Sequence, residues 1–164
     1  MRDIVNTDDE VIGQAEKSEI EEKGLICRVA FVMLHNARGE LLLHQRAATK
    51  RAYPLYWSGA AAGHVNAGET YEEAAHRELH EELGIETKCQ RVGNFYSEAD
   101  REMVGVFLGS YDGPIKIEEA EVARVEHFSL DRLSRERDAM LVTSFVDRSL
   151  PMVAEALKAV QDPS

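Results

Sequence analysis

The feature that most constrains this chain is a helix whose two ends are both marked, at Thr70 and Gly84. Thr70 is followed three positions later by Glu73, the pattern of a capping box, in which each residue satisfies a backbone N–H group of the other. Gly84 provides the left-handed conformation at which helices commonly stop. At about 100° per residue, one apolar side follows, made of Tyr71, Ala75, Leu79 and Leu83. We therefore expect an amphipathic helix that packs on a core.

Three glutamates, Glu78, Glu81 and Glu82, fall within an arc of roughly 100° that adjoins this apolar side. Like charges at this spacing repel each other, and acidic groups in the last turn oppose the helix dipole. Two interpretations are open. The carboxylates form an oxygen cage for Mg²⁺ or Mn²⁺, or they form a solvated acidic face with Arg77 as their partner.

The loop before the helix favours the first interpretation. Gly63 and Gly68 bracket a tight turn, and Gly63 has no side chain where backbone could approach a metal or a phosphate. Glu69 directly precedes the cap and is placed to reach Arg77, which would brace the loop against the helix.

The spacing G-x5-E-x7-R-E-(apolar)-x-E-E-x-G-(apolar) is filled by Gly63, Glu69, Arg77, Glu78, Leu79, Glu81, Glu82, Gly84 and Ile85. In this pattern the chain resembles the Nudix hydrolases, and every fixed position of their box is matched. The resemblance implies an α/β fold, an α/β/α sandwich with a mixed sheet and C-terminal helices. It also implies Glu78 and Glu82 as metal ligands, Glu81 as a ligand or the base, and the Gly63 carbonyl as a further ligand. Arg77 would orient the glutamates and pair with Glu69.

The flanking sequence is similar to a branch of this family close to isopentenyl diphosphate isomerase. There, basic residues at the places of Arg46 and Lys50 hold the diphosphate, although an ordinary basic loop is the alternative. His64 matches a histidine ligand of the isomerase and lines the expected pocket, and Asp100 and Glu102 match its acidic pair. Two positions depart from the isomerase: Ala62 stands where its catalytic cysteine is expected, and Arg28 replaces a metal-binding histidine. Because alanine cannot move a proton to or from carbon, hydrolysis is favoured over isomerisation.

Chain length and apolar periodicity bound the organisation. With 164 residues and 44% apolar content, one domain covering residues 1–164 is expected. We expect a hairpin extension over residues 1–24 and strands in CRVAFVML, ELLLHQR, WSGAAAG, TKCQRVGNFYSEA, REMVGVFLGSYD and residues 122–128. A short helix follows a Ser129 cap, and a C-terminal helix over residues 151–161 starts near Pro151.

The composition excludes several classes of function. Thirty acidic residues against nineteen basic ones give a net charge of −11, which argues against nucleic-acid and membrane-surface partners. Cys27 and Cys89 are far apart and read as reduced thiols. The N-terminal segment is too polar for a signal peptide, and a cytoplasmic protein is expected. The hairpin extension could mediate a homodimer.

Three functions are compatible with these residues. The first is Mg²⁺- or Mn²⁺-dependent hydrolysis of the diphosphate bond in a nucleoside diphosphate derivative or a similar small metabolite. Its base would be Glu81, or a glutamate from elsewhere: Glu102, Glu118, Glu119 or Glu121. The second is an isoprenoid diphosphate isomerase, disfavoured by Ala62. The third is a non-catalytic module that binds a diphosphate, which would not need the whole ligand set.

Overall fold

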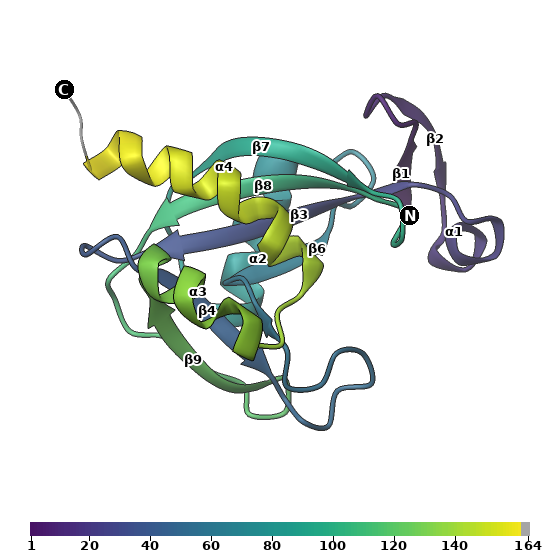
Figure 1. Ribbon diagram of the computed structural model, residues 1–164. Helices are drawn as coiled ribbons and strands as arrows, with labels where there is room; N and C mark the ends of the chain where they lie inside the picture. The colour runs from purple at the N-terminus through teal and green to yellow at the C-terminus, as the bar shows by residue number, and fades with distance from the viewer. Residues whose placement is uncertain (162–164) are drawn as a thin grey trace.

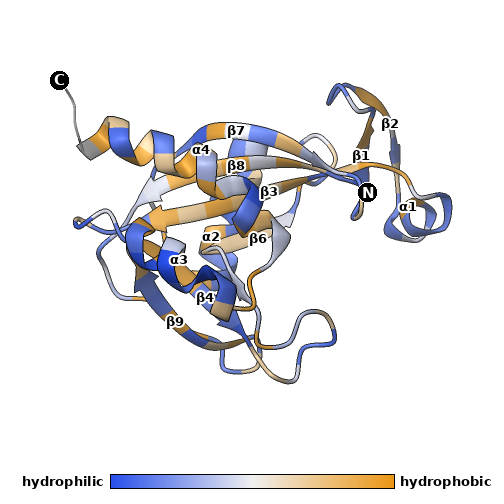
Figure 2. Ribbon diagram, in the orientation of Figure 1, coloured by the Kyte–Doolittle hydropathy of each residue, from blue (hydrophilic) through white to orange (hydrophobic). Residues whose placement is uncertain are grey.

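The structure, a computed structural model, describes residues 1–161. Its central strand is β3 (Cys27–His35), and side chains along a strand point alternately to opposite faces. Successive residues of β3 enter two different apolar cores, with Val29, Phe31 and Met33 on one side and Ala30, Val32 and Leu34 on the other. A continuous apolar run is what a strand covered on both faces requires, and Figure 2 shows that run as a hydrophobic band along β3.

Nine strands of the described chain form one mixed sheet, which confirms the expected fold class. Along its whole length β3 runs parallel to β8 (Glu102–Ser110), and β7 (Cys89–Ser97) pairs antiparallel with β8. On its other edge, β3 pairs antiparallel with β6 (Ala61–His64). The sheet therefore places the residues of β6 beside the centre of the molecule.

A second group of strands diverges from β3. β4 (Leu41–Arg46) pairs with β3 only at its start, then runs between β5 (Trp57–Ser58) and β9 (Val122–Phe128). The segment WSGAAAG, expected as one strand, is thus two strands in different parts of the sheet. Gly59 lies at the break, where an added Cβ would come within 2.7 Å of Phe31.

Helices cover both faces of the sheet (Figure 1). α2 (Tyr71–Leu83) packs on β3, β6 and β7. On the opposite face lie α3 (Leu130–Glu136), a 3-10 turn (Arg137–Ala139) and α4 (Ser144–Gln161), with α4 contacting β7 and β8. In the described residues, no helix is both long and apolar enough to cross a membrane.

The C-terminal helix differs from expectation at its start. α4 begins at Ser144, so Pro151 lies inside it rather than in its first turn. An interior proline removes one backbone hydrogen bond and costs about 3 kcal/mol. Val146, before the proline, and Val153 and Leu157, after it, are all buried. Burial of this continuous apolar side offsets the proline and keeps the helix in one piece.

The N-terminal extension forms the expected hairpin and a short helix: β1 (Arg2–Val5), β2 (Val11–Ala15) and α1 (Lys17–Lys23). β1 joins the sheet through Ile4, which pairs with Cys27 of β3. Figure 1 shows the hairpin and α1 at one end of the molecule, away from α3 and α4.

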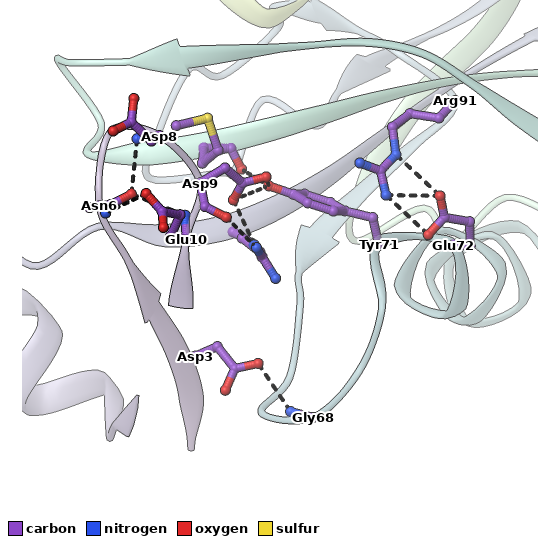
Figure 3. A network of polar contacts seen from close by, with 11 residues as sticks. Asp3, Asn6, Asp8, Asp9, Glu10, Gly68, Tyr71, Glu72 and Arg91 are labelled. Atoms are coloured by element: carbon purple, nitrogen blue, oxygen red, sulfur yellow. Dashed lines mark hydrogen bonds and ion pairs between the residues drawn. The ribbon is translucent and has the colours of Figure 1, made fainter. Parts of the chain in front are cut away.

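A set of hydrogen bonds made by Asp9 and Asp3, the polar clasp, holds the hairpin to α2 and the loop before it (Figure 3). Asp9, at the hairpin turn with a φ of 62°, accepts hydrogen bonds from Arg28 Nε at 2.7 Å and from the Tyr71 hydroxyl at 3.0 Å. Asp3 accepts a bond from the Gly68 amide at 3.2 Å. The extension therefore contacts both the first residue of α2 and the loop that precedes it.

Candidate functional site

The ends of α2 are fixed as the sequence predicts. Glu73 N donates to Thr70 Oγ1 at 3.1 Å, and Thr70 N donates to Glu73 Oε2 at 2.9 Å. Gly84 takes a φ of 63° and closes the helix through the His80 carbonyl. With both ends set, the predicted apolar side is buried, and Glu78 lies next to it with only 9% exposure.

Arg77 ties the preceding loop to the helix. Its Nε and Nη2 atoms donate to the two oxygens of Glu69 at 2.8 and 2.9 Å, and Nη2 also donates to the His64 carbonyl at 2.9 Å. Its Nη1 donates to Glu78 Oε1 at 2.7 Å and lies 3.5 Å from Glu81 Oε2. The guanidinium holds the pKa of Glu69 below its ordinary value. Charge-assisted bonds of this kind are the stronger ones in proteins, so Arg77 fixes the orientation of Glu78.

Gly63 packs directly against the Glu78 carboxylate. A Cβ added at Gly63 would lie 2.0 Å from Glu78 Oε1, a distance that non-bonded atoms do not reach. The backbone of β6 and the carboxylate are therefore as close as they are because residue 63 has no side chain. The arrangement forms a small polar cradle that a methyl group would fill.

The pKa of Glu82 reflects the crowding of carboxylates next to this cradle. Desolvation of its carboxyl group raises the pKa of Glu82 to about 8, and the neighbouring charge of Glu78 adds to the shift. Glu81 and Glu82 are both exposed residues, whereas Glu78 is buried. Carboxylates crowded until one holds its proton near neutral pH are a donor set that a divalent cation would stabilise. The residues present thus fit a hard divalent metal ion.

Glu81 and Glu82 border a cavity of about 340 Å³. Glu81, Glu82 and Leu83 of α2 form one wall, and Ala60 and Ala62 line it from the β5–β6 segment. The cavity is also lined by His44 and Arg46 of β4 and by Glu118 and Glu121 of the segment before β9. The cavity lies where β4 diverges from β6, and its volume is within the range of small-molecule sites.

The two predicted basic residues behave differently. Arg46 lines the cavity together with Glu81 and Glu82. Its Nε donates to the Ala52 carbonyl at 3.0 Å, and no hydrogen bond engages its terminal nitrogens within residues 1–161. Lys50 is outside the cavity lining and forms an ion pair with Glu121. The structure thus places Arg46 in the same cavity as Glu81 and Glu82, whereas Lys50 does not line that cavity.

His64 faces another part of the surface. Its Nε2 lies 3.0 Å from Glu102 Oε1, and both residues line a separate depression with Cys27. The potential ligand atoms of Cys27, His64 and Glu102 lie within 4.8 Å of one another. Contact with Cys27 first, and the bond to Glu102 second, raise the pKa of His64 to about 9. His64 does not border the cavity of Glu81 and Glu82, and Cys27 and Cys89 are free thiols.

The other acidic candidates divide in the same way. Glu118 and Glu121 line the cavity, but Glu119 does not. Glu102 faces His64, and Asp100 accepts a bond from the Ser97 hydroxyl at 2.6 Å. Within residues 1–161, the acidic groups that line the cavity from outside α2 therefore come from the segment before β9.

One cavity residue, His44, was not anticipated from the sequence. It lies on β4, two positions before Arg46, and lines the same cavity. Burial lowers its pKa, so the ring is neutral near pH 7. The only available sequence signal was its place in the strand, since residues two apart share one face.

The comparisons with known proteins agree with this geometry. The family profile described as the NUDIX domain matches residues 26–148. A protein of Pseudomonas aeruginosa, named as an uncharacterised Nudix hydrolase, is 35% identical over 160 residues, which cover 96% of this chain and 89% of that protein. A protein of Photorhabdus laumondii named isopentenyl-diphosphate Delta-isomerase 2 is 35% identical over 116 residues, 66% of each chain.

Solved structures show the same architecture. The crystal structure of DR0079 from Deinococcus radiodurans superposes with a TM-score of 0.76 and 25% sequence identity. The superposition covers 94% of this chain and 97% of that one. A superposition of that extent includes residues on both sides of the matched segment 26–148.

Proposed function

The chain belongs to the Nudix hydrolase family, and on that premise we propose that it hydrolyses the diphosphate bond of a nucleoside diphosphate derivative or a similar small metabolite with Mg²⁺ or Mn²⁺. The observation that carries the proposal is the cradle of Gly63, Glu78 and Glu82 at the edge of a cavity that also holds Arg46. A bound cation stabilises crowded carboxylates, and the terminal nitrogens of Arg46 can donate hydrogen bonds to an anion.

In this proposal Glu78, Glu82 and the Gly63 carbonyl hold the ion, with Glu81 as a further ligand or the base. When bound, a divalent ion neutralises diphosphate oxygens and lowers the pKa of water. The protein groups do the remaining work. Arg77 orients Glu78 by donating a hydrogen bond to it. Arg77 also holds the loop at Gly63 in place by donating to Glu69 and to the His64 carbonyl.

Proton removal is assigned to Glu81. Its only contact with Arg77 is the long one of 3.5 Å, and its side chain is 57% exposed, so it can reach a water molecule in the cavity. Glu118 and Glu121 are alternative bases, but Glu121 is already paired with Lys50. Arg46 binds the phosphate through its terminal nitrogens, and Lys50 supports it after exchanging Glu121 for the substrate. A role for His64 in binding would need a substrate long enough to leave the cavity.

Isomerisation receives less support from the cavity wall. Ala62, at the place of the isomerase cysteine, lines the cavity with a methyl group that cannot carry a proton. We further propose that the whole chain acts as one domain, with residues 1–24 as its extension, in the cytoplasm and without nucleic acid as a partner. A homodimer through the extension stays a prediction.

A phosphate-release screen tests the hydrolase proposal, with an added phosphatase that frees phosphate from the phosphomonoesters produced when a substituted diphosphate is cleaved. Diphosphate metabolites are incubated with Mg²⁺ or Mn²⁺ and the wild type, Glu82→Gln or Glu86→Gln. Glu86 is a matched control, because its side chain is 86% exposed and it makes only a 3.8 Å contact with His80. We expect turnover by the wild type and Glu86→Gln and a loss of at least 100-fold in Glu82→Gln, on the order of an essential catalytic group.

Two outcomes would contradict the proposal. No turnover of any compound, with metal binding unaffected by Glu82→Gln, would remove its basis. Formation of the allylic isomer from isopentenyl diphosphate, in the same screen, would favour the isomerase instead.

A further inference from the structure

His44 presents a polar atom to the cavity that the proposed mechanism does not use. It alternates with Arg46 along β4, so both side chains leave the strand on the same face. Both line the cavity beside Glu81 and Glu82. His44 is therefore positioned to touch whatever group is attached to a phosphate held by Arg46.

The tautomer of His44 follows from its partner. Nδ1 is hydrogen bonded to the backbone carbonyl of Gly59. A carbonyl oxygen can only accept, so Nδ1 must carry the hydrogen. In a neutral imidazole the other nitrogen, Nε2, is then an acceptor with a lone pair.

That lone pair is accessible. Within residues 1–161, Ser149 Oγ is the only fully buried side-chain nitrogen or oxygen that lacks a hydrogen-bond partner. The bonding of His44 there involves Nδ1 alone. Nε2 is consequently in contact with solvent, and the open space that His44 borders is the cavity.

The ring is also held in place. The backbone of residue 44 pairs with Ser58 of β5 on one side and with Val125 of β9 on the other. Together with the bond to Gly59, these contacts fix both the strand and the ring orientation. A polar group held in this way is preorganised for recognition.

We propose that His44 is a specificity-determining residue whose Nε2 accepts a hydrogen bond from a hydroxyl or amino group on the part of the substrate attached to the diphosphate. The inference rests on the proposed function for the place of the phosphate near Arg46. Residues two apart in a strand are separated by about 7 Å, so the donor lies a few bonds from that phosphate. A purely hydrocarbon substituent would leave the lone pair desolvated and unpaired, which disfavours binding.

Matched ligands isolate this one hydrogen bond. ω-Hydroxyalkyl diphosphates of two to five carbons are compared with counterparts in which a methyl group replaces the hydroxyl. Calorimetry with Mg²⁺ gives Kd, and phosphate release gives kcat and KM. For the best chain length, the wild type should bind the hydroxyl compound on the order of 10-fold more tightly. In His44→Phe the ratio should fall to near one, while His76→Phe, at an exposed position of α2, should keep it.

The tautomer provides a second readout that does not depend on ligands or turnover. The ¹⁵N spectrum of the histidine rings should contain a neutral ring protonated at Nδ1 whose signals disappear in His44→Asn, which can still donate to Gly59. The ring of His35, whose Nδ1 lies 2.9 Å from the Asn36 carbonyl oxygen, should be unaffected. Protonation at Nε2 of the ring whose signals His44→Asn removes, a binding ratio unchanged in His44→Phe, or no binding of either series would overturn the inference. Binding with the expected ratio but without hydrolysis would support His44 and contradict the proposed reaction.

Discussion

Replacing Gly63 by alanine tests the cradle most directly. The new Cβ would lie 2.0 Å from Glu78 Oε1 and 2.1 Å from Glu78 Cδ. Since ordinary contacts begin near 3.4 Å, the carboxylate must move by more than about 1 Å. That movement breaks its 2.7 Å bond with Arg77 Nη1.

The magnitude follows from that bond. A hydrogen bond to a charged group contributes about 1.5–3 kcal/mol. For a chain of this size, each kcal/mol shifts Tm by about 2–4 °C, so the metal-free variant should melt roughly 3–12 °C lower. Displacement of Glu78 should also weaken Mg²⁺ binding by about 10-fold or more.

Calorimetric melting with and without Mg²⁺, together with a metal titration, measures both effects. Gly13→Ala is the matched control, because Gly13 has ordinary backbone angles and nothing within 4 Å of an added Cβ. If Gly63→Ala and Gly13→Ala melt together and bind Mg²⁺ equally, the close approach of Gly63 to Glu78 has no energetic role, and the reasoning is refuted.

Three further perturbations address neighbouring groups. The pKa of Glu82, raised to about 8, means that the metal-free native state keeps a proton which the unfolded chain releases above about pH 4.3. The free energy of unfolding should therefore fall as the pH rises from about 4.5 to 8, and Mg²⁺ should reduce this fall. Urea titrations measure the free energy of unfolding, and an equal fall in Glu82→Gln would contradict the prediction. Arg77→Lys cannot keep the forked contact with Glu69, so Mn²⁺ affinity should drop about 10- to 100-fold by titration; unchanged affinity would show that the fork is dispensable. Asp9→Ala removes the carboxylate that accepts hydrogen bonds from Arg28 Nε and the Tyr71 hydroxyl, and should lower the unfolding free energy by about 1–3 kcal/mol, with faster hydrogen exchange confined to residues 2–15; a uniform rise in exchange would argue against a local clasp.

The parts of the site that lie close together in sequence could be predicted. Thr70, Glu73 and Gly84 set the length of α2, and the helical repeat then places Glu78 and Glu82 together. The contact between Glu69 and Arg77 spans the cap and follows from the same local geometry. These relations depend on backbone periodicity, which a single sequence contains.

The opposite wall of the cavity could not be predicted in the same way. His44 and Arg46 come near α2 only because β4 leaves β3 after two residue pairs and runs beside β9. The position of His64, turned toward Cys27 and Glu102, depends likewise on the pairing of β3 with both β6 and β8. Such pairings join residues far apart in the chain, and no local pattern specifies them.

The start of α4 illustrates a different difficulty. Proline is favoured in the first turn of a helix, so the sequence predicts a helix that starts near Pro151. In the structure, burial of Val146 ahead of the proline outweighs the missing backbone hydrogen bond. Tertiary packing therefore starts α4 earlier in the chain than the preference of proline for the first helical turn predicts.

The clasp at Asp9 has a practical consequence for the smallest fragment that can be prepared. Residues 26–148 match the family profile and would be the natural choice for expression. Cutting there removes Asp9, so the Arg28 guanidinium and the Tyr71 hydroxyl lose the carboxylate that accepts their hydrogen bonds at the first turn of α2. It also removes Val153 and Leu157, which are buried against the far face of the sheet. We therefore expect the folding unit to extend beyond the matched family segment at both ends.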